Sequence, residues 1–129
     1  MADTISLQTY LLMQLAEEAS EVAQAVSKCV LYSPKHTAPE YTHSNIENLE
    51  MELNDLLGTV RLLKYSGLNL ELSKEAQYAK AVKITQYAAI SAVIGTLKES
   101  DVAYLRSRLG DLRVDLKPVA GGANRAASD

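Results

Sequence analysis

The sequence predicts an all-α protein, and three observations support this fold class. Leucine and alanine, both strong helix formers, supply 19 and 17 of the 129 residues. No proline lies between Pro39 and Pro118, so long uninterrupted helices fit in this interval. Apolar residues recur at spacings of three and four, which is the period of a helix buried on one side. We therefore expect one domain, a four-helix bundle over residues 1–117.

The first helix is expected to begin at about Asp3 or Ser6 and to end at about Leu31. Its apolar residues lie on one face when successive residues are projected about 100° apart. A polar loop follows and extends to residue 43. The loop contains both histidines of the chain, His36 and His43, which we expect to be exposed.

The second helix has the clearest boundaries. Ser44 and Glu47 form a capping-box pattern at its start, and Gly67 suits the left-handed position after its end. Between them, leucine and valine recur at alternating spacings of four and three residues. This predicted seam consists of Leu49, Leu53, Leu56, Val60 and Leu63. Such a seam is typical of a helix packed lengthwise against another helix.

Two further helices are expected in the second half of the chain. The third is predicted from residue 73 to residue 94 or 97. The fourth is predicted from residue 100 or 101 to residue 112 or 116, interrupted or ended near Gly110. Residues 118–129 contain a Gly-Gly pair and small polar residues, and they are expected to form a flexible tail.

The charge of the chain is distributed unevenly. The net charge of −3 is too small to indicate a general nucleic-acid binder. Residues 1–60 carry nine acidic and two basic residues, whereas residues 61–129 carry seven acidic and eleven basic ones. One half of the chain could thus hold cations and the other half anions. The alternative is a bundle that pairs an acidic helix with a basic one.

Other classes of protein are excluded by simple features of the sequence. There is no run of 18 apolar residues, and the first residues lack the pattern of a signal peptide. A cytoplasmic protein that binds neither a membrane nor a nucleic-acid polymer is expected. Cys29 is the single cysteine, so an internal disulfide is impossible, and the histidines do not lie at a zinc-site spacing from it.

Two pairs of carboxylates border the apolar faces of the first two helices. Glu18 falls within the apolar face of the first helix, with Glu21 beside it, and Glu52 and Asp55 border the leucine seam. Residues three apart on a helix point the same way, so packing the two helices would bring four carboxylates together. Four anions in a half-buried site require divalent cations, and oxygen ligands suit Mg²⁺, with Mn²⁺ as a substitute.

These acids have two alternative explanations besides a magnesium site. They could be rim charges of the bundle, paired with Lys28, Arg61 or Lys64. A di-iron carboxylate bundle would also use inward glutamates, but it needs Glu-x-x-His on two helices, and here both histidines lie in the loop.

The two acidic motifs resemble those of the MazG-like all-α nucleoside triphosphate pyrophosphohydrolases. The motifs are Glu17-Glu18-Ala-Ser-Glu21 and Glu52-Leu-Asn-Asp55, and a later segment, Lys80-Ala-Val-Lys-Ile-Thr-Gln-Tyr87, is similar to a lysine-rich stretch of the family. The resemblance covers about residues 10–90. It implies a bundle of the all-α pyrophosphatase type, and hydrolysis of deoxyribonucleotides or non-standard nucleotides to the monophosphate and pyrophosphate.

The resemblance also implies roles for individual residues. Glu18, Glu21, Glu52 and Asp55 would hold Mg²⁺, and Glu17 would support a ligand or orient the attacking water. Candidates for substrate binding come from the basic half and from the first two helices. These candidates are Lys28, Lys80, Lys83, Tyr87, Gln14 and Asn48, with Tyr32 and Tyr41 as further candidates for base recognition.

The chain is expected to associate with copies of itself, and two rival functions stay open. The leucine seam and the resemblance together predict a homodimer or homotetramer formed through helix packing. The main rival is a non-catalytic helical interaction module whose acids only solubilise the rim of the bundle. A second rival is a specialised relative, such as a dUTP or dCTP pyrophosphatase or a phosphoribosyl-ATP pyrophosphohydrolase.

Overall fold

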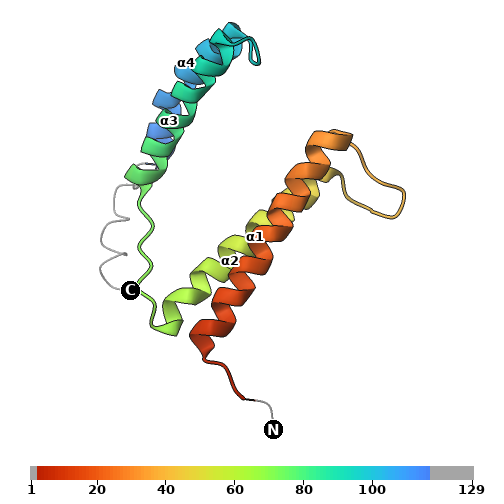
Figure 1. Cartoon of the computed structure of the whole chain (residues 1–129), viewed down its shortest axis with the longest axis vertical. Helices are drawn as coiled ribbons and strands as arrows, with labels where there is room; N and C mark the ends of the chain where they lie inside the picture. Colours follow the sequence, from red (N-terminus) through yellow and green to blue (C-terminus); the bar gives the residue numbers. More distant parts are fainter. Residues whose placement is uncertain (1–2, 117–129) are drawn as a thin grey trace. The chain divides into compact units, whose positions relative to one another are not determined.

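The computed structural model describes residues 3–116, and all regular elements among them are helices (Figure 1). The elements are α1 (Leu7–Tyr32), α2 (Asn45–Leu63), the short 3-10 helix η1 (Lys64–Ser66), α3 (Lys74–Val93) and α4 (Glu99–Leu116). The predicted all-α class is confirmed for this part of the chain. The chain divides into two compact units, residues 1–70 and 71–129, and each unit is described by itself. The predicted single domain stays a prediction, and the predicted tail lies outside the described residues.

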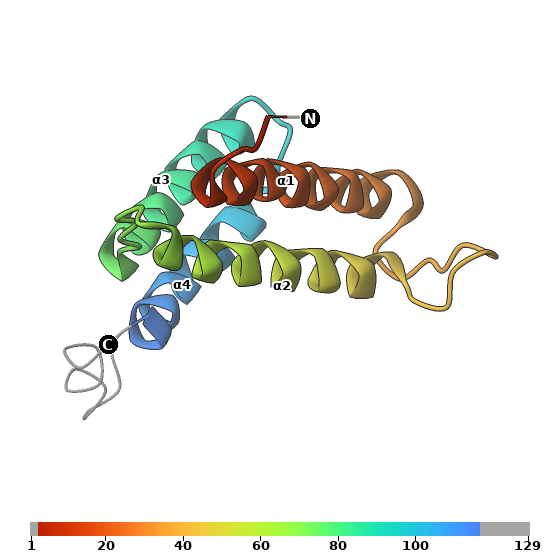
Figure 2. The same ribbon diagram turned by 90° about the horizontal axis from the view of Figure 1, so that it is seen from below.

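In the first unit, α1 and α2 lie side by side and run antiparallel, in both views of the chain (Figures 1 and 2). The hydroxyl of Ser6 caps α1 by accepting a hydrogen bond from the backbone N–H of Thr9 at 3.0 Å. The inner face of α1 is the predicted one, because Leu11 and Ala25 are buried and Glu18 is half-buried between them. The expected apolar face of the first helix is therefore confirmed.

The connection between α1 and α2 is folded back onto the start of α2. The predicted capping box is present, with the Ser44 hydroxyl accepting from the backbone N–H of Glu47. The side chain of Asn45 is only 4% exposed, and its Nδ2 donates to the carbonyl oxygens of Ser33 at 3.0 Å and Lys28 at 3.4 Å. Ser33 itself has a φ of 81°, which turns the chain sharply at the end of α1. These contacts fasten both ends of the loop to one another.

The face of α2 that meets α1 is rotated relative to the predicted seam. Leu53 is 42% exposed, so the prediction that it lies in the seam is wrong. The face of α2 that packs on α1 is centred closer to Glu52 than the predicted seam is. This rotation places polar residues between the helices and leaves Leu53 exposed. The buried or half-buried residues of α2 are Asn45, Asn48, Leu49, Glu52, Leu56, Thr59, Val60 and Leu63.

The end of α2 matches its predicted signal. The helix narrows into η1 after Leu63, which is completely buried. Gly67 follows with a φ of 88° in the left-handed region, which glycine adopts without the steric cost of a Cβ atom. The predicted glycine stop is confirmed, with one turn of 3-10 helix added before it.

The second unit is an α3–α4 hairpin. The hydroxyl of Ser73 caps α3 by accepting from the backbone N–H of Ala76 at 3.1 Å, and Thr85 and Val102 are buried between the helices. The prediction of a break near Gly110 is wrong, because α4 continues through it. Glycine within a helix costs roughly 1 kcal/mol relative to alanine. Half-buried leucines on both sides of Gly110 offset this cost by packing.

A second apolar stripe on α1 is exposed. Its members follow the helical spacing of four and three residues. They are Leu12, Ala16, Ala19, Ala23, Val26 and Val30. On α2, Ile46, Leu53 and Leu57 are also exposed apolar residues. From α1 to α4, none of the described helices combines the length and apolar character that crossing a membrane requires.

The capping box makes a stability prediction. Replacing the cap serine in Ser44→Ala removes the acceptor for the Glu47 N–H, and we expect a loss of about 1 kcal/mol in the free energy of unfolding. Urea unfolding followed by circular dichroism measures this loss. Ser27→Ala is the matched control, because Ser27 is an exposed helical serine that only donates to the carbonyl of Ala23. Equal stability of the two variants would contradict the proposed role of the cap.

Candidate metal centre

Three carboxylates meet between α1 and α2. Glu18 on α1 and Glu52 and Asp55 on α2 each offer one oxygen, and these oxygens all lie within 4.8 Å of one another. Glu52 and Asp55 lie three residues apart and so lie on neighbouring parts of one helix face. The antiparallel pairing of the two helices brings Glu18 opposite them. The structure thus brings together three of the four predicted metal ligands.

Two of these carboxylates carry an oxygen with no partner. The Oε2 atoms of Glu18 and Glu52 have lost contact with solvent, and within residues 3–116 neither accepts a hydrogen bond. Buried oxygen atoms of this kind are unfavourable unless a donor or a cation satisfies them. The two oxygens, which lie between α1 and α2, therefore lack the donor or cation that would satisfy them.

The local electrostatics agree with this geometry. Burial is the main cause that raises the pKa of Glu18 above its ordinary value of 4.5, followed by the neighbouring charges of Glu21, Asp55 and Glu17. Burial also raises the pKa of Glu52, and the neighbouring carboxylate of Glu21 adds to the effect. Each group is thus harder to ionise because its surroundings are apolar and negative. A divalent cation would reverse both effects.

The other two predicted acids flank the cluster. Glu21 is half-buried one turn after Glu18 and lies beside Glu52, although it is outside the group whose oxygens lie within 4.8 Å of one another. Glu17 is exposed on α1 and acts on Glu18 through its charge. The metal role of Glu21 and the supporting role of Glu17 stay predictions.

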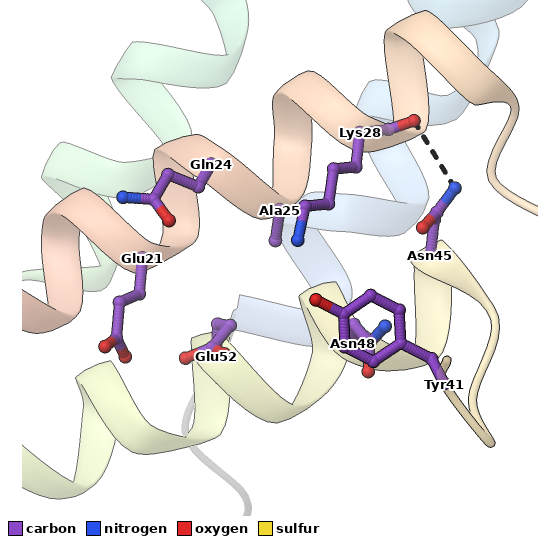
Figure 3. Close-up of a pocket in the computed structure, with 8 residues that line it drawn as sticks. All are labelled: Glu21, Gln24, Ala25, Lys28, Tyr41, Asn45, Asn48 and Glu52. Carbon is purple, nitrogen blue, oxygen red and sulfur yellow. Dashed lines mark hydrogen bonds between the residues drawn. The ribbon is translucent and has the colours of Figure 1, made fainter. Parts of the chain in front are cut away.

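A cavity of about 200 Å³ lies next to the cluster and extends toward the α1–α2 loop (Figure 3). Lys28 and Asn48, both predicted substrate-binding residues, line it, and the Lys28 Nζ lies 5.2 Å from the centre of the Tyr41 ring. The lining residues are Glu21, Gln24, Ala25, Lys28, Tyr41, Asn45, Asn48 and Glu52. Because Glu21 and Glu52 form one wall, the cavity opens directly beside the carboxylates.

The remaining substrate-binding candidates lie elsewhere. Gln14 is half-buried on α1, one turn before Glu18, and does not line the cavity. Lys80, Lys83 and Tyr87 lie on α3 in the second unit, where the Lys83 Nζ is 5.9 Å from the centre of the Tyr87 ring. All three are exposed. Their approach to the carboxylates stays a prediction.

Sequence reasoning missed three of the cavity residues, Gln24, Ala25 and Asn45. Asn45 directly follows the capping serine and lies on the inner face of α2, so a polar residue at an inward position was the available signal. Its bonds to the end of α1 are long-range contacts that helical periodicity does not reveal. Neither histidine belongs to the carboxylate cluster. His43 contacts Glu47 at 3.4 Å, and the ring of His36 lies beside Tyr32.

Comparisons of the chain with protein-family models, with curated proteins and with solved structures find no match. The resemblance of the two acidic motifs to the MazG-like family therefore stays a prediction. An inference about function therefore rests on the arrangement of Glu18, Glu52 and Asp55 and on the cavity beside them.

The raised pKa values predict how stability changes with pH. Above the ordinary value of 4.5, and up to the raised values, folded Glu18 and Glu52 bind more protons than the unfolded chain, so stability falls as pH rises through this window. The lowered pKa of Glu47, which accepts hydrogen bonds from Ser44, has the opposite effect below 4.5. In the absence of divalent metal, Glu52→Gln should unfold at a higher temperature than the wild type at neutral pH, with a weaker pH dependence.

Thermal unfolding in EDTA over mildly acidic to neutral pH measures this difference. Glu50→Gln is the matched control, since Glu50 is an exposed glutamate of α2 and the change removes the same charge. A Glu52→Gln protein that melts with the control, or below it, would show that the cluster is not under electrostatic strain.

Proposed function

We propose that this chain is a Mg²⁺-dependent nucleoside triphosphate pyrophosphohydrolase that uses the carboxylates between α1 and α2. The main support is that three carboxylates from two facing helices each place an oxygen within 4.8 Å of the others. Two of these carboxylates also have a buried oxygen that lacks a hydrogen-bond partner among the described residues. Rim charges in ion pairs would not leave such oxygens unsatisfied. The order of the acidic motifs, which resembles the MazG-like family, supports the same function.

The donor set favours a hard divalent cation. The cluster consists of Glu18, Glu52 and Asp55, and carboxylate oxygens suit Mg²⁺ or Mn²⁺, whereas zinc favours nitrogen and sulfur ligands. Glu18 and Glu52 would hold the cation from opposite helices. When bound, it supplies neutralisation of charge on the phosphate oxygens and orients the attacking water.

The proposed reaction asks for little covalent work from the protein. Water attacks the α-phosphorus, the bond from this phosphorus to the bridging oxygen breaks, and pyrophosphate leaves with that electron pair. The proton of the water passes to a carboxylate that is free of metal, for which Glu17 and Glu21 are the available flanking groups. No nucleophilic serine, cysteine or histidine is needed, which agrees with the composition of the site.

Positive side chains would complete the site. Lys28 already lies in the adjacent cavity, and within the described residues it makes no ion pair. Lys80, Lys83 and Tyr87 share one region of α3 and are proposed to bind the phosphates from the second unit. Deoxyribonucleotides or non-standard nucleotides are the proposed substrates, and specialised relatives acting on dUTP, dCTP or phosphoribosyl-ATP form the alternative.

Charge-neutral variants test the metal role. Glu52→Gln and Asp55→Asn preserve side-chain volume, and we expect each to lower kcat/KM with Mg²⁺ by at least about 100-fold, because metal ligands supply several kcal/mol to the transition state. Mg²⁺ at 100 times its Kd should stabilise the wild type by about 2.7 kcal/mol and leave these variants unchanged. The readouts are release of pyrophosphate from a nucleotide panel and thermal unfolding.

Glu50→Gln serves again as the control, and it should keep both the turnover and the response to Mg²⁺. A wild type that shows neither turnover nor stabilisation by Mg²⁺ would favour the rival function, a non-catalytic interaction module. The exposed apolar stripe on α1 supports that rival function, because a partner could bind there, and the rival needs no metal.

A second copy of the chain is proposed to cover apolar surface in a homodimer or homotetramer. The stripe from Leu12 to Val30 on α1 supports this, since the α1–α2 hairpin alone leaves it exposed. Light scattering should give at least twice the 14.0 kDa mass of one chain. Val26→Glu, within the stripe, should lower this mass, whereas Ser20→Glu, exposed outside it, should not. A wild type that elutes only as a 14.0 kDa species would overturn the proposal.

A further inference from the structure

The cavity beside the carboxylates has a composition that the metal centre does not explain. It lies between α1, α2 and the loop that joins them, and its two ends differ in chemistry (Figure 3). One end is formed by Glu21 and Glu52, next to the cluster. The other end carries Tyr41, Lys28 and Asn48, which together offer an aromatic face, a cation and an amide. A metal site alone needs none of these three groups.

We propose that this cavity binds the nucleobase of the substrate and selects bases that carry a carbonyl oxygen facing Lys28. The inference rests on the proposed function and adds to it the class of base. Adenine nucleotides, whose base has no carbonyl oxygen, are excluded as good substrates. Uracil, thymine, cytosine, guanine and hypoxanthine nucleotides, whose bases all carry a carbonyl oxygen, are favoured.

The size and walls of the cavity fit one planar ring system. Its volume of about 200 Å³ is below the roughly 300–1,000 Å³ of pockets that enclose a whole drug-sized ligand. Ala25 is buried and forms an apolar wall, while the ring of Tyr41 offers a surface on which a base can stack. The sugar and phosphates would then lie outside the cavity, toward Glu52 and the cluster.

Two amides are available to bind the edge of a base. The side chains of Gln24 and Asn48 line the cavity and make no hydrogen bond among the residues that the structure describes. An amide offers both donors and an acceptor, which is what the mixed edge of a base requires. The third amide, that of Asn45, is already engaged with the carbonyls of Ser33 and Lys28, so it shapes the cavity without reading the base.

Lys28 supplies the selectivity. An ammonium group only donates hydrogen bonds, so it favours a carbonyl oxygen and cannot accept from an exocyclic amine. Its Nζ lies over the Tyr41 ring, 5.2 Å from the ring centre, so the cation and the aromatic ring line the same end of the cavity. Lys28 is exposed in the empty cavity, and a base that enters covers it, so a base that lacks the acceptor would leave this donor without a partner.

The test is a comparison of kcat/KM for UTP, GTP, CTP and ATP with Mg²⁺. For the wild type, kcat/KM for UTP, GTP and CTP should each exceed that for ATP by at least about tenfold. Lys28→Met keeps the length of the side chain but removes its donor, and it should lower the ratio of UTP to ATP by about 10- to 100-fold. Lys35→Met is the matched control: Lys35 is an exposed lysine of the loop that does not line the cavity, and its ratio should stay that of the wild type.

The outcomes separate this inference from the proposed function. If Lys28→Met lowers kcat/KM equally for all four nucleotides, Lys28 binds phosphate, and the base selectivity is overturned while the enzyme activity stands. If the wild type hydrolyses none of them, the proposed function fails, and titration with uridine and adenosine followed by NMR tests the cavity alone. Shifts of the Tyr41 and Asn48 signals by uridine and not by adenosine support the inference. Absence of shifts with uridine overturns it.

Discussion

Repulsion among carboxylates between two packed helices is the constraint on which the rest of the structure depends. Glu18 and Glu52 occupy inward positions where apolar side chains would each contribute about 1.5–3 kcal/mol. The hairpin lacks this contribution at its middle and has it at its open end, where Leu11 and Leu63 are buried. A cation bound by the cluster would convert an unfavourable contact into a favourable one. The proposed metal binding would thus be linked to folding of the first unit through the same oxygens.

The α1–α2 hairpin has two long sides with different chemistry. One side carries the cavity and its polar walls, including Lys28 and Asn48. A separate strip of α1 carries the alanine-rich apolar residues from Leu12 to Val30. Small side chains in such a stripe allow another helix to approach closely. A helix that covered the apolar stripe would leave the carboxylates and the cavity free, so the proposed ligand binding and the proposed helix association would not compete for the same surface.

What could be predicted from the sequence was local in origin. The cap at Ser44 and the stop at Gly67 depend on residues within one turn, and the structure has both where the sequence predicts them. The convergence of the acidic pairs follows from helical periodicity. Leu53 and Gly110 were predicted wrongly because tertiary packing set the rotation of α2 and carried α4 past its glycine. The end of the cavity near the loop depends on long-range hydrogen bonds from Asn45 of α2 to the carbonyls of Lys28 and Ser33, which no periodicity encodes.

The distance between the cavity and the carboxylates follows from the geometry of a single helix turn. Asn48 and Glu52 lie four residues apart on α2, so they are separated by about 6 Å along the helix axis. Glu52 belongs both to the carboxylate cluster and to the wall of the cavity. A group bound beside Asn48 is therefore held at a fixed distance from the carboxylates by a rigid element. Because the loop supplies Tyr41 while the helices supply the acids, changes in the loop would alter the ligand preference of the proposed base site and leave the proposed metal site intact.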